Sequence, residues 1–598
     1  MAERQISDDL QNVLPEFRAI FEEIFLDEDS DEFDGFDEQD VEDETDVRHI
    51  FDEESWQEGG RRPSTFTFVS RAGINENVLP VPEENTLSYL EYFESIVSDT
   101  IVSKVVDETN NYATNYLQTH QNLPPFSRLG NWTNTSVPEM KSFLGITIAM
   151  GIVRQLDIQD YWSTNVVIST PFFNTVMSRD RFLALMSFLH LSDNNIAVLR
   201  GQPGYSPLQK LGDPYKDILS NFQRVYTPGK NIAIDEGMIP WRGNLHFRVY
   251  SPDKPCKYGL KMYMLCDSAN GYCSRMELYT GRDGQQQPPS QFGATYNLVL
   301  RLVSPYLNKG YHLYMDNYFS SPQLFYELYL QATVACGTVR SNRRGIPQKL
   351  KSQRLTKGEI FVVHNSTLVA VKYADKKDVI LLTTIHEGVK VDTGRLDQDG
   401  SHIVKPDCVL SYNRYMGAVD RCDQMVANGS FDRRTLKWWK KVFFHMIGLA
   451  VLNSYILYKS RTRHPVHQRI FRRELVSQLM EVSELSGAAP RGRKRTSAEI
   501  LQRLTARHFM SHLPPTDKRS HGKRRCVVCG PGELELFKSS HPHEPVPKCM
   551  GRETTFQCKQ CQVALCIEPC FELFHTKSEY VLAYKRQKTA TTQSGQEE

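Results

Sequence analysis

The chain has 598 residues, of which 40% are hydrophobic and 11% aromatic, so it is long and apolar enough to bury several cores. This composition excludes a single small domain and a wholly disordered chain. The formal net charge is zero, yet residues 1–60 contain 23 acidic residues and only three basic ones. The rest of the chain is correspondingly basic, which favours a body that binds a polyanion beside an acidic tail.

Neither a secretory signal nor a membrane span is expected. The first residues are acidic and contain no apolar core region. The longest apolar run, Val442–Tyr458, contains His445 and Asn453 and is short for a membrane span, so we expect a buried helix. Seven of the thirteen cysteines fall between Cys526 and Cys570. This crowding indicates metal binding in a reducing compartment and argues against disulfides.

The first 225 residues divide into two parts. Residues 1–85 are acidic and poor in periodicity, which predicts a disordered tail. Within it, Leu10–Phe25 has the pattern of a short amphipathic helix. From residue 86 to about 225, apolar residues recur at helical spacing, as in Ser142–Met150 and Arg179–Leu191. We therefore expect a helical domain over 86–225.

Strand and helix patterns alternate from residue 226 to about 460, which predicts an α/β core with an insertion at about 341–408. The expected strands are Asn231–Pro240, Lys261–Asp267, Cys273–Tyr279, Tyr311–Met315, Thr333–Val339 and Val379–Thr384. The expected helices are Tyr296–Val303, Pro322–Gln331, Met416–Met425 and Trp438–Tyr458. A helical and basic linker (461–525), a Cys-rich domain (526–580) and a disordered end (581–598) complete a multi-domain α/β chain.

Aspartates stand at the edges of three predicted elements. Asp235 and Asp316 come at the ends of apolar strands, while Asp420 and Asp423 share one face of a predicted helix. Phosphoryl transfer on DNA needs hard cations, and two Mg²⁺ ions about 4 Å apart can serve both the attacking and the leaving oxygen. Mg²⁺ prefers carboxylate oxygens and water. Taken singly, each aspartate is more simply a turn former or a helix cap, so the flanking residues must decide.

Four motifs around these acids occur in one order along the chain. They are IDEGMIPWRG (234–243), KPCKYGLK (254–261), DNYFSS (316–321) and YNRYMGAVDRCDQ (412–424). In this order and with this spacing, the chain resembles the piggyBac transposase family from about residue 86 to residue 575. Ala418 stands where the family usually has glycine. Since alanine is a good helix former, we expect this exchange to leave the site intact.

The resemblance implies a fold, an activity and a site. It implies a ribonuclease-H-like catalytic core between a helical dimerisation and DNA-binding domain and a small C-terminal zinc-binding domain. Family members excise an element at TTAA through DNA hairpin ends and insert it at another TTAA. By position, the catalytic and magnesium-binding residues are Asp235, Asp316 and Asp420, joined by Asp423. Mg²⁺ or Mn²⁺, double-stranded DNA and a homodimer are the implied cofactor and partners, with no small-molecule substrate.

Basic and aromatic residues near the acids are candidate DNA contacts. Cations position a duplex through its phosphates, and the candidates are Arg242, Lys254, Lys257, Lys261 and Lys437. Trp438, in the run Arg433–Lys441, is the candidate by family position for stacking on a displaced base, a contact of ~1–3 kcal/mol. Alternatively, the basic residues form a solvated face, and Trp438 and Trp439 anchor the helix that follows.

The C-terminal region has the spacing of a zinc module. The predicted zinc ligands are Cys526, Cys529, Cys558, Cys561, Cys566, Cys570 and His575. Paired cysteines two residues apart are typical of zinc knuckles. Seven ligands suggest two zinc ions and an eighth ligand elsewhere, and the possible residues are Cys549, His521, His541 and His543. One structural zinc with spare cysteines is the simpler alternative. The resemblance implies a cross-braced module that binds DNA at the transposon end, although Cys570 and His575 depart from the spacing of the insect prototype.

Three hypotheses about function remain. Basic runs at Arg491–Arg495 and Lys518–Arg525 match nuclear import signals or DNA contacts, so we expect a nuclear protein. The first hypothesis is an active DNA transposase, which the four intact acids favour. The second is a domesticated, transposase-derived DNA- or chromatin-binding protein. The third is a zinc-dependent protein-interaction module with the α/β part as scaffold.

Deleting residues 1–60 should strengthen non-specific DNA binding, because the acidic segment competes with DNA for the basic body. The difference should be largest at low salt and should fade as salt screens the charges. Titration of a random-sequence duplex into the full chain and the truncated chain, at two salt concentrations, measures it. Equal affinity at low salt would contradict the competition.

Overall fold

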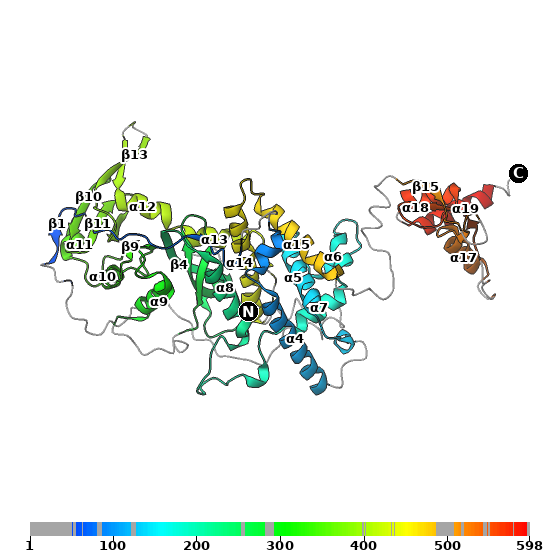
Figure 1. The fold of residues 1–598 in the computed structure, drawn as a ribbon, viewed down its shortest axis with the longest axis horizontal. Helices are drawn as coiled ribbons and strands as arrows, with labels where there is room; N and C mark the ends of the chain where they lie inside the picture. Colours follow the sequence, from blue (N-terminus) through cyan, green and yellow to red (C-terminus); the bar gives the residue numbers. More distant parts are fainter. Residues whose placement is uncertain are drawn as a thin grey trace. The chain divides into compact units, whose positions relative to one another are not determined.

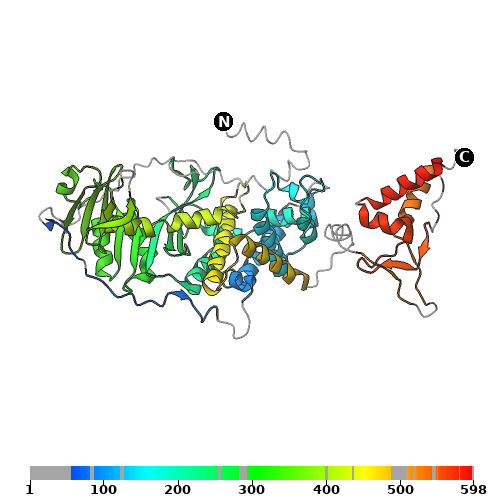
Figure 2. The same cartoon turned by 90° about the horizontal axis from the view of Figure 1, so that it is seen from above.

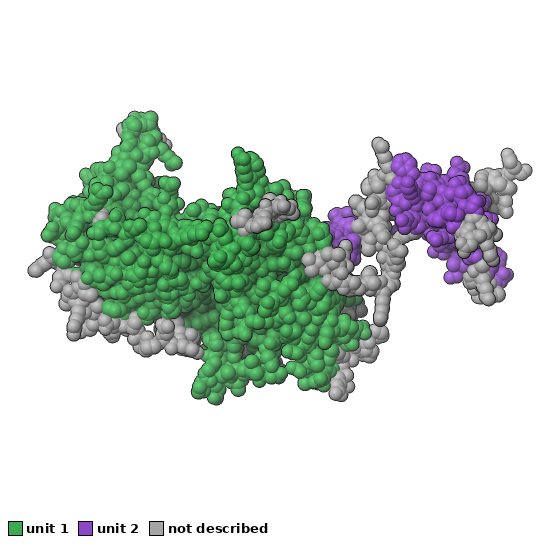
Figure 3. All heavy atoms as spheres, viewed as in Figure 1, with its two compact units in different colours: residues 1–154, 180–487 green, residues 155–179, 488–598 purple. Residues whose placement is uncertain are grey.

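The computed structural model describes residues 51–594 (Figure 1), with gaps at 52–54, 63, 81–86, 121–126, 253–256, 282–291, 397–399, 401, 432, 434, 436, 486–507, 516–519, 542–543, 545–546, 548–549 and 578. The chain forms two compact units (Figure 3), of which the first comprises 1–154 and 180–487 and the second 155–179 and 488–598. The predicted helix at Leu10–Phe25 lies outside the described residues.

A ten-stranded mixed sheet organises the first unit. In spatial order its strands run β1-β10-β11-β12-β9-β8-β4-β6-β5, with β7 also paired to β6. Three central strands are parallel, namely β4 (Asn231–Pro240), β8 (His312–Met315) and β9 (Val334–Thr338). On one side of them lie the antiparallel strands β6 (Tyr258–Asp267), β7 (Cys273–Leu278) and β5 (Val249–Tyr250). The predicted α/β core is confirmed.

The parallel strands are joined by helices that cover one face of the sheet. These are α9 (Ala294–Val303) and α10 (Pro322–Leu330), close to their predicted bounds. Ile232, Ile234, Leu313 and Met315 face them in one apolar cluster, since alternate strand residues point to the same face. The opposite face contacts α12 (Asp407–Tyr415), α13 (Ala418–Ala427) and α14 (Trp438–Arg461).

The insertion between β9 and α12 extends the same sheet. Its strands are β10 (Ile360–His364), β11 (Val369–Ala374) and β12 (Asp378–Thr383), and β12 pairs antiparallel to β9. A short helix, α11 (Gln348–Ser352), precedes them. A separate ribbon, β13 (Lys390–Leu396) with β14 (His402–Pro406), projects from this end (Figure 1).

Helices from both ends of the first unit form one layer. They are α3 (Tyr89–Glu94), α4 (Asp99–Thr119), α5 (Val137–Ile152), α7 (Arg179–Phe188), α8 (Gly212–Val225) and α15 (Gln468–Leu485). α15 packs on α5 and α3, so this part of the predicted linker 461–525 belongs to the helical layer. In Figures 1 and 2 the blue and cyan helices lie beside the green sheet, with α14 between them.

Helix α14 joins the helical layer to the sheet. Among the described helices it has the length and hydropathy of a membrane span, but 89% of its most apolar window is buried in the protein. Asn453 explains the docking, because its amide donates to Cys273 O at 2.8 Å and accepts from Cys273 N at 3.0 Å on β7. A buried amide needs such partners. The predicted buried helix is confirmed.

The predicted disordered tail over 1–85 does not extend to residues 55–80. β1 (Gln57–Glu58) pairs with β10, and β2 (Gly73–Ile74) pairs with β3 (Tyr226–Thr227). Trp56, only 4% exposed, enters the apolar cluster under α9 and α10. Burial of this large ring and the added strand hold the segment, although its composition is polar.

The second unit contains the cysteine-rich region. Its elements there are β15 (Met510–His512), β16 (Arg524–Arg525), α17 (Cys529–Ser540), β17 (Glu553–Thr554), β18 (Phe556–Cys558), α18 (Glu572–Thr576) and α19 (Tyr580–Ser594). β15 pairs with β18, so the domain begins well before residue 526. The predicted disordered end at 581–598 is helical through Ser594. Tyr584 on α19 is buried and donates to Glu533 at 2.7 Å, which fixes the helix on α17.

Short elements complete the described chain. The segment 155–179 carries η3 (Gln159–Trp162) and α6 (Pro171–Val176), whose rings Tyr161 and Phe173 lie 4.5 Å apart. The remaining short helices are η2 (Arg128–Asn131), η4 (Asn194–Ile196), η5 (Gln209–Leu211), η6 (Ser304–Tyr306) and η7 (Ile567–Phe571).

Candidate functional site

The parallel pairing of β4 with β8 places two of the predicted acids next to each other. Ile234 is in register with Met315, so Asp235 and Asp316 occupy the following position on neighbouring strands. Both acids alternate away from the apolar cluster that contains Ile234 and Met315. Their carboxylates therefore belong to the face covered by α12, α13 and α14.

Helix α13 brings the other two acids to this face. Asp420 lies in its first turn and Asp423 one turn later, and the helix packs across β4 and β6. Gly237, two residues beyond Asp235, provides the room. A Cβ there would lie 3.2 Å from Asp423 Oδ1 and under 3 Å from the ends of Met262 and Met264. The close approach of α13 to β4 therefore depends on a residue without a side chain.

Asp316 lies in an environment that opposes its charge. Burial raises the pKa of Asp316, and the negative charge of Glu236 raises it further. The backbone N–H of Tyr318 donates to its Oδ1 at 3.0 Å and works in the other direction. A nearby cation stabilises the ionised form of such a carboxylate and lowers its pKa. One is built into the chain: Lys261 Nζ lies 2.5 Å from Glu236 and 4.5 Å from the ring centre of Tyr318.

The spacing of the acids indicates what they can hold. Among the described residues, the groups that bring three or more His, Cys, Asp or Glu ligand atoms within 4.8 Å of one another all lie in the second unit. The four aspartates thus form a wider site. Two Mg²⁺ ions about 4 Å apart, each with oxygen ligands at about 2 Å, need carboxylates spread over roughly 8 Å. Carboxylate oxygens are the hard donors that divalent cations such as Mg²⁺ prefer.

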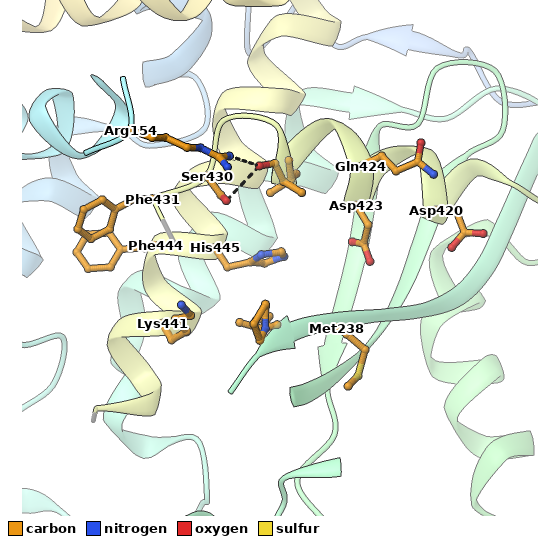
Figure 4. A pocket seen from close by; sticks show the side chains of 14 residues that line it. Arg154, Met238, Asp420, Asp423, Gln424, Ser430, Phe431, Lys441, Phe444 and His445 are labelled. Carbon is orange, nitrogen blue, oxygen red and sulfur yellow. Dashed lines mark hydrogen bonds between the residues drawn. The ribbon is translucent and has the colours of Figure 1, made fainter. Parts of the chain in front are cut away.

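A cavity of about 460 Å³ adjoins the two carboxylates of α13 (Figure 4). Asp420, Asp423 and Gln424 reach it from α13, and Lys441, Phe444 and His445 come from α14. Arg154 and Phe431 line a third side. Carboxylates on one wall and cationic or aromatic side chains on the other suit a phosphodiester strand, which offers both anions and flat bases.

The predicted DNA contacts differ in how accessible they are. Arg242 and Lys257 are exposed. Lys261 is largely buried in its ion pair with Glu236, and Lys437 is only 7% exposed. Trp438 is half-buried, with its ring edge-on to Phe247 at 5.2 Å, which is the arrangement expected of a helix anchor. Lys254 lies outside the described residues. DNA contact by each of these side chains stays a prediction.

Two residues of the site were not singled out from the sequence. Glu236 follows Asp235 and holds Lys261, and Tyr412 on α12 has its pKa raised by burial and by the charges of Asp316 and Asp235. The phenol is therefore within electrostatic range of both carboxylates. Both residues belong to the motifs quoted above, and their position in those motifs could have identified them as part of the site.

The second unit gathers the predicted zinc ligands into two groups. One group is Cys526, Cys529, Cys566 and Cys570, and the other is His508, Cys558, Cys561 and His575. The pairs alternate along the chain, as the resemblance implied. All seven predicted ligands belong to one of the two groups, which favours two zinc ions over one zinc with spare cysteines.

The surroundings of both groups suit zinc. Backbone N–H groups donate to three of the sulfurs at 3.4 Å, namely Cys526, Cys529 and Cys558. A hydrogen bond from the Cys570 thiol lowers the pKa of Cys526, which favours the thiolate form that binds metal. His575 Nδ1 lies 2.7 Å from Phe571 O, which leaves Nε2 to face the group. Such support of ligands is usual in zinc sites.

His508, which was not considered from the sequence, completes the second group, while His521 and His541 belong to neither group. His508 Nδ1 lies 3.4 Å from the sulfurs of both Cys558 and Cys561. His521 instead stacks on His512, and His541 stacks on Phe537. Cys549 and His543 lie outside the described residues. No spacing motif marks His508, because the pairing of β15 with β18 brings it to the site from outside the cysteine-rich segment.

Comparison with known proteins identifies the family. A family model described as "Transposase IS4" matches residues 89–455, more than half of the chain. The chain belongs to this transposase family. Human PiggyBac transposable element-derived protein 3 is 23% identical over 501 residues, covering 81% of this chain and 76% of that protein. Human PiggyBac transposable element-derived protein 2 is 24% identical over 469 residues, covering 74% and 72%.

A solved structure agrees with this assignment to the piggyBac type. The cryo-EM structure of a piggyBac transposase synaptic complex with hairpin DNA matches with a TM-score of 0.63 and 25% identity. The match covers 83% of this chain and 98% of that one. This member of the family therefore has the predicted fold class. Its family places it among DNA-binding nucleases and strand transferases.

Replacing Gly237 with alanine should lower metal-dependent DNA cleavage by this transposase by about tenfold, because the new methyl group pushes against Asp423. DNA affinity should stay within about twofold of wild type. Ala233→Gly on the same face of β4 is the matched control. Cleavage by Gly237→Ala equal to wild type would contradict the argument that α13 needs this close approach.

His508→Ala should reduce the zinc content from two ions per chain to one, because its group keeps only three ligands. His521→Ala should retain two, since it belongs to neither group. Inductively coupled plasma mass spectrometry of the purified chains measures the ratio. Two zinc ions in the His508→Ala chain would exclude His508 as a ligand.

Proposed function

We propose that this protein is a cut-and-paste DNA transposase that excises an element at TTAA through hairpin ends and reinserts it at TTAA. The observation that carries the proposal is the convergence of four carboxylates from β4, β8 and α13 on one face of the sheet. In this proposal Asp235, Asp316 and Asp420 are the catalytic residues, with Asp423 beside Asp420. A purely DNA-binding descendant has no use for all four.

The carboxylates would hold Mg²⁺ or Mn²⁺. Bound ions of this kind lower the pKa of an attacking hydroxyl and neutralise the charge that the phosphate carries in the transition state. The protein's own contribution is to fix the acids on rigid elements, where small displacements cost rate. Lys261, held between Glu236 and Tyr318, adds a positive charge next to the site. Arg242 and Lys257 are exposed and would position the duplex through its phosphates.

The cysteine-rich module would bind transposon-end DNA with two zinc ions as its structural support. This proposal rests on the two ligand groups and on the DNA complex of the solved relative. A homodimer and a nuclear location are further parts of the proposal. The basic residues Lys523, Arg524 and Arg525 precede the first ligand pair and supply the cationic sequence that an import receptor requires.

Purified full-length protein should cut a linear duplex in which the genomic sequences flanking its own gene border TTAA, and only with Mg²⁺ or Mn²⁺ present. Asp235→Ala, Asp316→Ala and Asp420→Ala should each reduce cleavage by at least about a hundredfold while still binding the duplex. Asp392→Ala, an exposed acid on β13, is the control that should cut normally.

Denaturing gels distinguish the outcomes by showing nicked, hairpin and transferred strands. Tight binding of these flanks without any cleavage would overturn the transposase proposal and favour a domesticated DNA-binding protein. Neither binding nor cleavage would favour a zinc-dependent interaction module. Cleavage that persists in the three aspartate variants would move the active site elsewhere.

A further inference from the structure

The C-terminal end of α13 is held by a buried arginine. Arg472 on α15 is only 4% exposed. Its Nη1 donates to Gly429 O at 2.5 Å and its Nη2 to Met425 O at 3.5 Å. Burial lowers the pKa of Arg472 to about 10, so the guanidinium is charged at neutral pH. Within the described part of the chain, no carboxylate lies within ion-pair distance of it.

Two more side chains reach the same helix end. Arg154, just after α5, donates from Nη2 to Ala427 O at 2.9 Å (Figure 4), and Gln468 on α15 donates to Met425 O at 3.5 Å. The carbonyls at 425, 427 and 429 thus receive donors from α15, from the end of α5, and from α15 again. All three donors belong to the helical layer, and α13 itself packs on the sheet.

The positive charge of the two arginines is stabilising at this position. The last carbonyls of a helix carry partial negative charge, and cations next to them are stabilising. A buried guanidinium without an acid partner is costly, so it persists where a fixed set of carbonyls compensates it. Here that set is the end of the helix bearing Asp420 and Asp423.

Two glycines make the contact tight. A Cβ on Gly429 would lie 2.1 Å from Arg472 Nη1, and a Cβ on Gly151 would lie 2.2 Å from Gly429 O. The backbone after α13 is therefore wedged between α5 and α15. At the other end of the helix, Arg421 donates to Ser268 O at 2.8 Å in the β6–β7 turn. Helix α13 is fixed at both ends by guanidinium groups on backbone carbonyls.

The side chains of Arg472, Arg154 and Gln468 form a cap on the carbonyls at the C-terminal end of α13. We propose that the helical layer positions α13 through this cap, with Arg472 and Arg154 as positioning residues for Asp420 and Asp423. The inference rests on the proposed transposase function, because it assigns the cap a role in that site. The cap makes the distance of both carboxylates from Asp235 and Asp316 depend on α5 and α15. Substitution of Arg472 should act on the rate of the chemical step, because its side chain is buried and does not line the cavity. Arg154 also lines the cavity, so its role in the cap is read from the position of α13 and from metal affinity.

The test compares Arg472→Gln and Arg154→Gln with Arg473→Gln in the full-length protein. Arg473 is the matched control because it is the next residue of α15, is exposed and pairs with Glu474. Three quantities are measured: the cleavage rate at saturating flank duplex, the duplex Kd, and the Mn²⁺ Kd by electron paramagnetic resonance. Hydrogen exchange over residues 418–427 reports on the helix directly. Arg472→Lys keeps the charge and tests for rescue.

Both cap variants should cut about ten- to a hundredfold more slowly than Arg473→Gln, and the duplex affinity of Arg472→Gln should stay within about twofold of wild type. Mn²⁺ affinity should fall by about tenfold and amides of α13 should exchange faster, with partial recovery in Arg472→Lys. Unchanged rate, Mn²⁺ affinity and exchange in both folded variants would overturn the inference. If Arg472→Gln does not fold, the Mn²⁺ affinity and hydrogen exchange of Arg154→Gln decide, because neither depends on a contact of the exposed Arg154 with DNA.

The result separates the inference from the proposed function. If the wild-type protein binds the duplex that carries the sequences flanking its gene but never cuts it, the transposase function is overturned. Mn²⁺ affinity and hydrogen exchange need no cleavage, so they still decide whether the cap positions the two aspartates. A wild-type protein that cuts normally, with both cap variants equally active, overturns the cap alone.

Discussion

The parallel register between β4 and β8 is the constraint on which the site depends. Ile234 opposite Met315 sends both apolar side chains to the cluster under α9 and α10, and the next residue of each strand to the other face. A slip of one residue on either strand would turn its acid into the apolar cluster, where an ionised carboxylate is strongly disfavoured. The same apolar residues that build the core therefore fix Asp235 and Asp316 side by side.

The positions of Asp420 and Asp423 depend on how α13 packs on that face of the sheet. Helix α13 crosses β4 where Gly237 leaves room, and its ends are tied to the β6–β7 turn and to the helical layer. The acids thus come from three elements distant in sequence but fixed to one rigid frame. Lys261 is held within this frame by Glu236, so positive charge is supplied beside the carboxylates before any ligand binds.

Periodicity alone predicted most strands and helices of the core, because their apolar residues alternate with period two or recur at helical spacing. Periodicity could not give the strand order that makes Asp235 and Asp316 neighbours. The motifs around the two acids were the basis for placing them in one site. Tertiary contacts overruled composition where one residue decides the outcome, as Trp56 does for an acidic segment and Tyr584 does for the C-terminal helix. The sequence pattern did not predict His508 because strand pairing, and not spacing along the chain, brings it to Cys558 and Cys561.

The edges of the ten-stranded sheet have a consequence for contacts between copies of the chain. One edge ends in the two-residue strand β1, and the other is formed by the two-residue strand β5 and by β7. The backbone of β7 at Cys273 is already engaged by Asn453 from α14. Short or covered edge strands give a neighbouring strand little to add to. Extension of the sheet by a second copy is therefore disfavoured, which limits edge-to-edge aggregation.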